Sequence, residues 1–244
     1  MELLDRIRKY FAFDSGELNA LLITITIYGL IVSFSFDIGE ASLAAWSRYL
    51  LPSLLIAALA IMIHVAVIRA ASLRIGYKAE YKMNYYVLAF ALVLSIVTRG
   101  RIYFIVPGII MFHMLEGLRI GKFRYGINWW EVRWPLFFGV LSNILLALLF
   151  RVLSNVGNFA GNPLIEKVIL VNLSIAFFSM LPLPDFEGLY IYFSSTLVYA
   201  FTFSLMAGAC LAIYLNLGFW VSIIIPIVIG VSGWLIYLVK VEMK

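Results

Sequence analysis

The sequence predicts an all-α fold, a polytopic transmembrane helix bundle with about six to seven spans, on three observations. First, 64% of the 244 residues are hydrophobic and only 13% are charged, and a water-soluble chain cannot bury that much apolar surface. Second, the apolar residues form long runs, and about 20 such residues cross roughly 30 Å of hydrocarbon. Third, the charged residues gather in short segments between these runs.

The chain divides into a charged start and a membrane-embedded remainder. Residues 1–17 mix both signs of charge, so we expect no cleavable signal but either a disordered segment or an interfacial helix. Residues 18–244 are predicted to form one membrane domain, and the lone Cys210 permits no intrachain disulfide and is expected to serve packing. Its apolar runs lie near residues 18–36, 49–72, 84–98, 102–115, 134–153, 164–183, 189–214 and 217–239.

Two of these runs, 84–98 and 102–115, are short for a span, and only Arg99-Gly100-Arg101 separates them. Two structures remain open for them. They either form a thin helical hairpin, or the segment 99–115 is a strand or re-entrant stretch buried within protein, where irregular backbone is tolerated at membrane depth. The sequence leaves open whether either run crosses the bilayer.

The basic residues orient the spans. Two basic clusters follow the second run and precede the fifth, whereas residues 154–163 carry no charge. Because cytoplasmic loops are enriched in Lys and Arg, we predict a multi-pass protein of the cell membrane with both clusters in the cytoplasm. The net charge of +5 therefore reflects topology, and no nucleic-acid partner is expected. The two clusters are Arg69, Arg74, Lys78 and Lys82, and Arg119, Lys122, Arg124 and Arg133.

This orientation brings His64, near the end of the second run, to the same side as Asp185 and Glu187, which follow the sixth. An ionisable group within a span suggests function, and imidazole with carboxylate is a zinc-binding combination. The alternative is that His64 hydrogen-bonds a neighbouring carbonyl while both carboxylates are solvated in a loop.

Three stretches together resemble the site-2 proteases, which are intramembrane zinc metallopeptidases. The stretch from His64 to Gly76 is similar to the family's His-Glu-x-x-His segment, and Phe138 to Ala147 is similar to its Gly-Pro-x-x-Asn-x-x-x-Ala helix, with Asn143 in place. The stretch from Asn172 to Gly188 is similar to its Asn-Leu-x-x-Ala-x-Phe-Asn-Leu-Leu-Pro-x-Pro-Pro-Leu-Asp-Gly motif. The resemblance implies a site-2-protease-like core over about residues 50–200. It also assigns cleft or structural roles to Asn143, Asn172, Ser179, Pro182, Pro184, Asp185 and Gly188.

The chain departs from the family at the positions that carry chemistry. Val65 stands where the family has its catalytic glutamate, and Ile68 stands at the second histidine. His64 and Glu187 remain as two ligand positions, whereas catalytic zinc usually has three protein ligands. We therefore expect no cofactor, with zinc only if the site has been rebuilt. His113 is considered as a third ligand, but packing within a helix is the favoured interpretation.

These departures predict a non-catalytic pseudoprotease that binds transmembrane segments, since the prolines that break a helix after the sixth run are kept. Its expected partners are the lipid bilayer and a transmembrane segment of another membrane protein. One alternative is an active zinc-dependent intramembrane endopeptidase with a rebuilt site. Another is a small transporter or channel, in which broken helices and intramembrane polar groups also occur.

Overall fold

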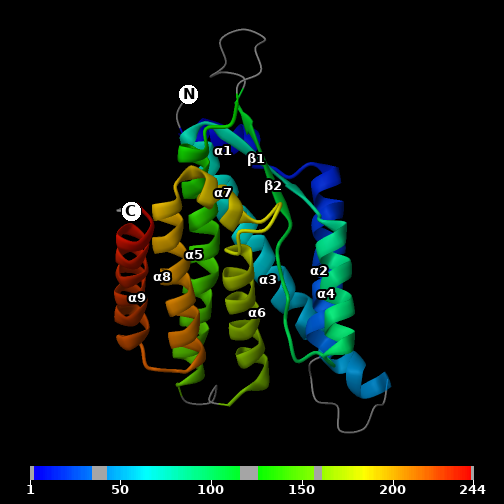
Figure 1. Ribbon diagram of the computed structural model, residues 1–244. Coiled ribbons are helices and arrows are strands. Elements are labelled where there is room, and N and C mark those ends of the chain that lie inside the picture. Colours follow the sequence, from blue (N-terminus) through cyan, green and yellow to red (C-terminus); the bar gives the residue numbers. More distant parts are fainter. Residues whose placement is uncertain (1–2, 35–42, 116–125, 157–160, 243–244) are drawn as a thin grey trace.

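The computed structural model describes residues 3–34, 43–115, 126–156 and 161–242 (Figure 1). Its elements in chain order are α1 (Leu3–Tyr10), α2 (Ser15–Phe34), α3 (Leu43–Ile75), β1 (Tyr77–Lys82), α4 (Tyr85–Val97), β2 (Ile109–Met114), α5 (Trp129–Ser154), α6 (Pro163–Ser179), α7 (Glu187–Ser194), α8 (Thr196–Tyr214), α9 (Val221–Tyr237) and a π-helical turn (Leu238–Glu242). The basic residues Arg119, Lys122 and Arg124, and part of the uncharged loop 154–163, lie outside the described residues.

Five of the described helices are long and apolar enough to cross a membrane, by length and composition. This confirms the prediction of a mostly helical fold and supports that of a membrane protein. Helices α4 and α6, with 13 and 17 residues, are shorter, and the count of six to seven spans stays a prediction. The five segments are Ser15–Phe34, Ser47–Ile75, Trp129–Ser154, Thr196–Tyr214 and Val221–Val241.

Helix α3 is central to the packing. It contacts α2 on one side and α5 and α6 on the other, and α5 in turn packs against α6 (Figure 1). Ile61 and Ile68 of α3, Leu136 of α5 and Ile169 of α6 are almost completely buried in this core. By contrast, α9 packs mainly on α8 and exposes most of its apolar surface, as expected for a helix facing lipid.

The two short apolar runs do not form a helical hairpin. The first is helix α4, but the second is extended and ends in β2, which pairs antiparallel with β1 so that Tyr77 lies opposite Met114. The strand alternative for segment 99–115 is therefore confirmed over Ile109–Met114, whereas β1 was not expected. Its signal was the alternation of Tyr77, Ala79 and Tyr81, all buried, with more polar neighbours.

Two tyrosines hold the extended chain that leads into β2. The Tyr28 hydroxyl of α2 donates to the Val106 carbonyl at 2.7 Å and accepts from the Val106 amide at 3.2 Å. The Tyr81 hydroxyl hydrogen-bonds the Pro107 carbonyl. Gly108 follows with φ of +141°, and a Cβ there would lie 2.8 Å from the Lys82 carbonyl oxygen. This backbone is therefore held by side chains where no neighbouring strand or helix pairs with it.

A buried ion pair joins the N-terminal part of the chain to α3. One Glu17 oxygen accepts from Arg69 Nη2 and from the Asp14 amide, both at 2.9 Å. The other accepts from the Tyr81 amide at 2.9 Å. Helix α1 is also tied to α3, because Arg6 donates to the Leu73 carbonyl at the end of α3. Residues of the charged N-terminal segment thus pack directly on the membrane domain.

Candidate functional site

His64 lies at the centre of a buried polar network. Its Nδ1 is 2.6 Å from Asn143 Oδ1, and its Nε2 is 2.6 Å from Glu187 Oε1. His64 and Asn143 are completely buried, and Glu187 is 4% exposed. Residues from α3, α5 and the start of α7 therefore meet at one point, although they are far apart in the sequence.

The amide of Asn143 fixes the orientation of the network. Its Nδ2 donates to the Ala60 carbonyl at 3.3 Å and to Asn172 Oδ1 at 2.9 Å. Asn172 Nδ2 in turn donates to the Val168 carbonyl at 2.8 Å. With Nδ2 of Asn143 used in this way, its Oδ1 must accept from His64, so Nδ1 carries a proton.

The proton on His64 Nδ1 determines how many protons the contact between His64 and Glu187 can hold. Because Nδ1 is protonated, the contact between Nε2 and Glu187 Oε1 holds one proton, bound either to the ring or to the carboxyl group. In the second case both groups are neutral, and no charge is buried. The pair thus forms a short hydrogen bond in a site sealed from solvent.

A tight turn carries Glu187 to this position. Helix α6 ends at Ser179, and the chain turns through Pro182 and Pro184 before α7 begins at Glu187. Gly188 permits the approach, since a Cβ there would lie 2.1 Å from the Met180 carbonyl oxygen. Proline lacks an amide donor and interrupts the helix, which explains why α6 does not continue.

Two polar atoms at the site have no partner within the part of the chain that the structure describes. They are Glu187 Oε2 and the Ser179 hydroxyl, and both are buried. An unpaired buried polar group costs about 1–3 kcal/mol. Within the described residues, Glu187 Oε2 is therefore a free hydrogen-bond acceptor next to the network of His64, Asn143 and Asn172.

The residues present do not fit a zinc ion. Zinc bonds of about 2.0–2.2 Å in tetrahedral geometry hold two ligand atoms more than 3 Å apart, whereas His64 Nε2 and Glu187 Oε1 are 2.6 Å apart. Ile68 fills the neighbouring space, because its Cγ1 lies 2.4 Å from where a Cβ on Gly139 would be. Among the described residues, no three His, Cys, Asp or Glu side chains are grouped to hold a metal.

Two other candidates lie elsewhere. Asp185 is in the exposed turn with φ of +67°, 3.4 Å from Asn84 Nδ2, and does not join His64. His113 is in strand β2, half exposed, and its Nε2 lies 3.2 Å from a carboxylate oxygen of Glu80. Its interpretation as a residue packed within a helix is wrong, because residues 109–114 are extended.

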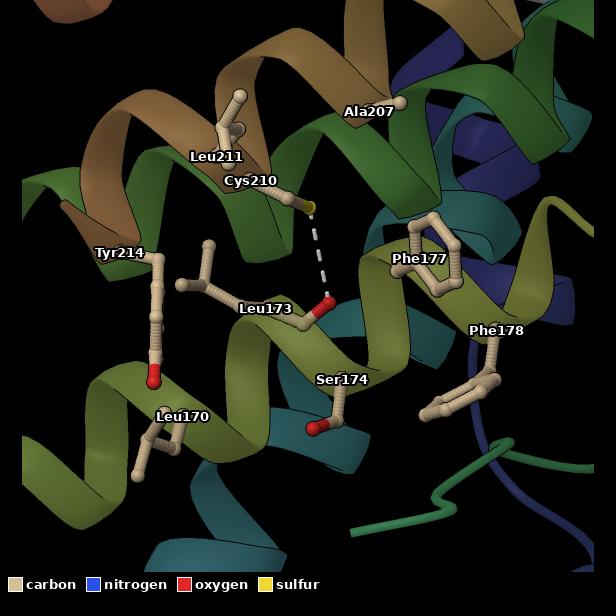
Figure 2. Close-up of a pocket in the computed structure, with 9 residues that line it drawn as sticks. All are labelled: Leu170, Leu173, Ser174, Phe177, Phe178, Ala207, Cys210, Leu211 and Tyr214. Atoms are coloured by element: carbon tan, nitrogen blue, oxygen red, sulfur yellow. Dashed lines mark hydrogen bonds between the residues drawn. The ribbon is translucent and has the colours of Figure 1, made fainter. Parts of the chain in front are cut away.

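An apolar groove between α6 and α8 was not foreseen from the sequence (Figure 2). It has a volume of about 350 Å³, and its lining includes Phe177 and Phe178 of α6 and Cys210 and Leu211 of α8. The thiol of Cys210 lies 3.7 Å from the Leu173 carbonyl. Asn172 does not line this groove, so the groove is separate from the polar network.

Comparison with known proteins finds no match: no family model matches the chain, and neither a curated protein nor a solved structure is similar to it. The resemblance to the site-2 proteases therefore depends on the three motif stretches and on the way they meet in space.

Proposed function

We propose that this protein is a non-catalytic relative of the site-2 proteases that binds transmembrane segments of other membrane proteins without cleaving them. One observation carries the proposal. The three motif stretches converge on one buried network, in which His64 and Glu187 touch while Val65 and Ile68 stand at the positions of the base and second ligand.

The loss of catalysis follows from residue chemistry. Hydrolysis by this kind of site uses a zinc-bound water and a carboxylate that takes its proton. Val65 and Ile68 are 3% and 0% exposed and offer neither a proton acceptor nor a ligand atom. General acid–base catalysis alone commonly contributes about 10²–10⁴ in rate.

The surface proposed for binding is the outer edge of β2. Leu115 donates to the Gly76 carbonyl at 3.0 Å, and antiparallel pairing alternates, so the backbone groups of Ile110 and Phe112 point away from β1. Outside the β1–β2 ladder, no hydrogen bond to either amide is found among the described residues. An open strand edge is a template for a further strand, and an extended partner segment would satisfy it.

This edge is connected to the polar network. The extended chain before β2 runs beside the end of α6 (Figure 1). Phe104 lies 4.7 Å from Phe178 and 6.3 Å from Phe186, ring centre to ring centre. Phe186 directly precedes Glu187. A segment bound along this edge would therefore lie next to the turn that carries the former ligand position.

The same proposal puts this end of the molecule on the cytoplasmic side of the cell membrane. Its support is the basic character of the chain there, including Arg74, Lys78 and Lys82.

Photo-crosslinking tests the binding surface. Benzoyl-phenylalanine would replace Met111 of β2, which is 37% exposed, or Leu235 of α9, which is 46% exposed and faces lipid. The probe is a labelled single-span peptide of about 20 apolar residues in lipid nanodiscs. We expect a crosslink at Met111 and little at Leu235, with the peptide intact. Equal labelling at both positions would refute the surface.

Restoring the missing groups tests the chemistry. Purified parent protein and the Val65→Glu/Ile68→His double variant would be analysed for zinc and for cleavage of the same peptide. We expect neither in the parent. Stoichiometric zinc in the parent, removed by His64→Ala, or cleavage that a chelator stops, would instead establish an active metallopeptidase.

A further inference from the structure

Arg133 lies between two tryptophans at the start of α5. Its guanidinium carbon is 4.2 Å from the centre of the Trp130 ring and 5.2 Å from that of Trp134. Both indoles are exposed, at 59% and 47%. Tryptophans are enriched at the headgroup level of membranes, so this arginine lies where lipid phosphates are found.

Among the described residues, no carboxylate balances the charge of Arg133. Its Nε and Nη1 are buried and have no hydrogen-bond partner, and no carboxylate lies within ion-pair distance of it in the described ranges. The nearby Glu131 interacts with the Tyr77 hydroxyl on β1 instead. An unpaired cation at the edge of the apolar layer is costly, and an anion at this position would remove that cost.

An apolar groove continues from the aromatic pair into the membrane. Trp134 stacks on Phe138 with ring centres 6.4 Å apart. Phe138 is also one wall of a groove of about 370 Å³ between α3 and α5. Ala70 and Ala71 form its shallow floor on α3. The polar Ser142 of its lining already donates to the Gly139 carbonyl at 2.6 Å.

We infer that Arg133 and this groove form a binding site for one anionic phospholipid. The phosphate pairs with the guanidinium between the indoles, and an acyl chain lies along the groove. Charge complementarity selects this occupant, because the head of the site is an unpaired cation and its body is apolar. Basic sites between transmembrane helices are suited to anionic headgroups, and Arg is suited to phosphate.

Lipid binding to purified, delipidated full-length protein in detergent tests the headgroup. The probes are dioleoylphosphatidylglycerol and dioleoylphosphatidylcholine, counted by native mass spectrometry. We expect the anionic lipid to bind more tightly, and Arg133→Gln to weaken it about tenfold, as for loss of a charged hydrogen bond. The matched control, Arg74→Gln, removes an exposed arginine from the same end of the molecule and should change affinity less than about twofold.

A second pair of variants tests the groove. Ala71→Phe fills its floor and should displace the lipid with Arg133 intact, whereas Leu55→Phe, on the exposed side of the same helix, should not. Arg133→Lys keeps the positive charge but lacks the planar guanidinium, and it should bind the lipid with intermediate affinity. This variant also tests the site if Arg133→Gln does not fold.

Three results would overturn the inference. These are equal binding of the two lipids, equal effects of Arg133→Gln and Arg74→Gln, and displacement of the lipid by inorganic phosphate alone. The last result would identify a phosphate site rather than a lipid site.

Discussion

Helix α3 carries two buried ion pairs little more than one turn apart, and they are built differently. His64 meets Glu187 at 2.6 Å, and Arg69 meets Glu17 at 2.9 Å. Glu17 uses both of its oxygens, with three donors in all. Glu187 uses one oxygen and leaves the other buried without a partner among the described residues. The Glu17 carboxylate therefore has both of its oxygens hydrogen-bonded, as expected for a structural anchor. The Glu187 carboxylate can still accept a further hydrogen bond.

The cations differ as well. Arg69 contributes a guanidinium, a permanent cation, and the ring of Phe13 covers it at 4.4 Å. His64 and Glu187 can instead share one proton and become neutral together. The comparison therefore predicts that the same substitution has unequal effects at the two glutamates.

The largest effect is expected for Glu17→Gln. It leaves Arg69 charged and buried without a counter-ion, which typically costs about 3–5 kcal/mol. Thermal unfolding in detergent would be followed with a thiol-reactive dye that reports exposure of Cys210, the only cysteine. The control is Asp14→Asn, at a side chain 70% exposed, for which less than about 1 kcal/mol is expected. Similar losses in both variants would contradict the anchor role.

Gly188→Ala should have the next largest effect, since its Cβ would meet the Met180 carbonyl oxygen at 2.1 Å. Overpacking costs about 1–3 kcal/mol, and the turn would shift Glu187 away from His64. The matched control is Gly16→Ala in α2, where a Cβ meets nothing within 4 Å. The same unfolding assay should show no loss for Gly16→Ala; equal losses at the two glycines would show that the turn is not tightly constrained.

With the shared proton on the carboxyl group, both partners are neutral, so Glu187→Gln should cost about 1 kcal/mol or less, because glutamine still hydrogen-bonds His64. Side by side with Glu17→Gln, this variant measures the difference between the two pairs. A loss as large as that of Glu17→Gln would instead place the shared proton on the His64 ring, so that the pair is charged.

The smallest effect concerns the exposed charges on the sheet. Burial raises the pKa of the Glu80 carboxyl, but the hydrogen bond and charge of Lys78 lower it by more than burial raises it. The pKa of Glu80 therefore lies below its ordinary 4.5. The ionised Glu80 carboxylate therefore stabilises the folded state above about pH 4.5. This stabilisation is lost as the pH falls through the lower pKa that Glu80 has in the folded state. Between pH 6 and pH 3 we expect Glu80→Gln to lose less stability than the parent, by under about 1 kcal/mol. A larger difference, or one of opposite sign, would contradict this assignment.

Part of the site was predictable from the sequence. The motif spacing singled out His64, Asn143, Asn172 and Glu187, and the structure joins all four by hydrogen bonds. The motif register assigned the ligand position to Glu187 and gave Asp185, two positions earlier, only a cleft or structural role. In the structure Asp185 has a left-handed conformation in the exposed turn and does not join His64.

The Glu17–Arg69 pair could not have been predicted in the same way. Glu17 was assigned to a charged N-terminal segment, and Arg69 to a basic cluster that marks topology. Nothing local in the sequence indicates that either is buried, since burial depends on β1 and α2 closing over the end of α3.

By itself the sequence determined that this is a helical membrane protein, because apolar composition and run length depend only on residue type. It also singled out residues that could carry chemistry, His64 and Glu187 among them. The tertiary structure alone decided that segment 101–114 is extended and that His64 meets Glu187, because strand pairing and helix packing join residues distant in the chain. It likewise decided that Arg133 has no acidic partner among the described residues, since pairing depends on where neighbouring carboxylates point.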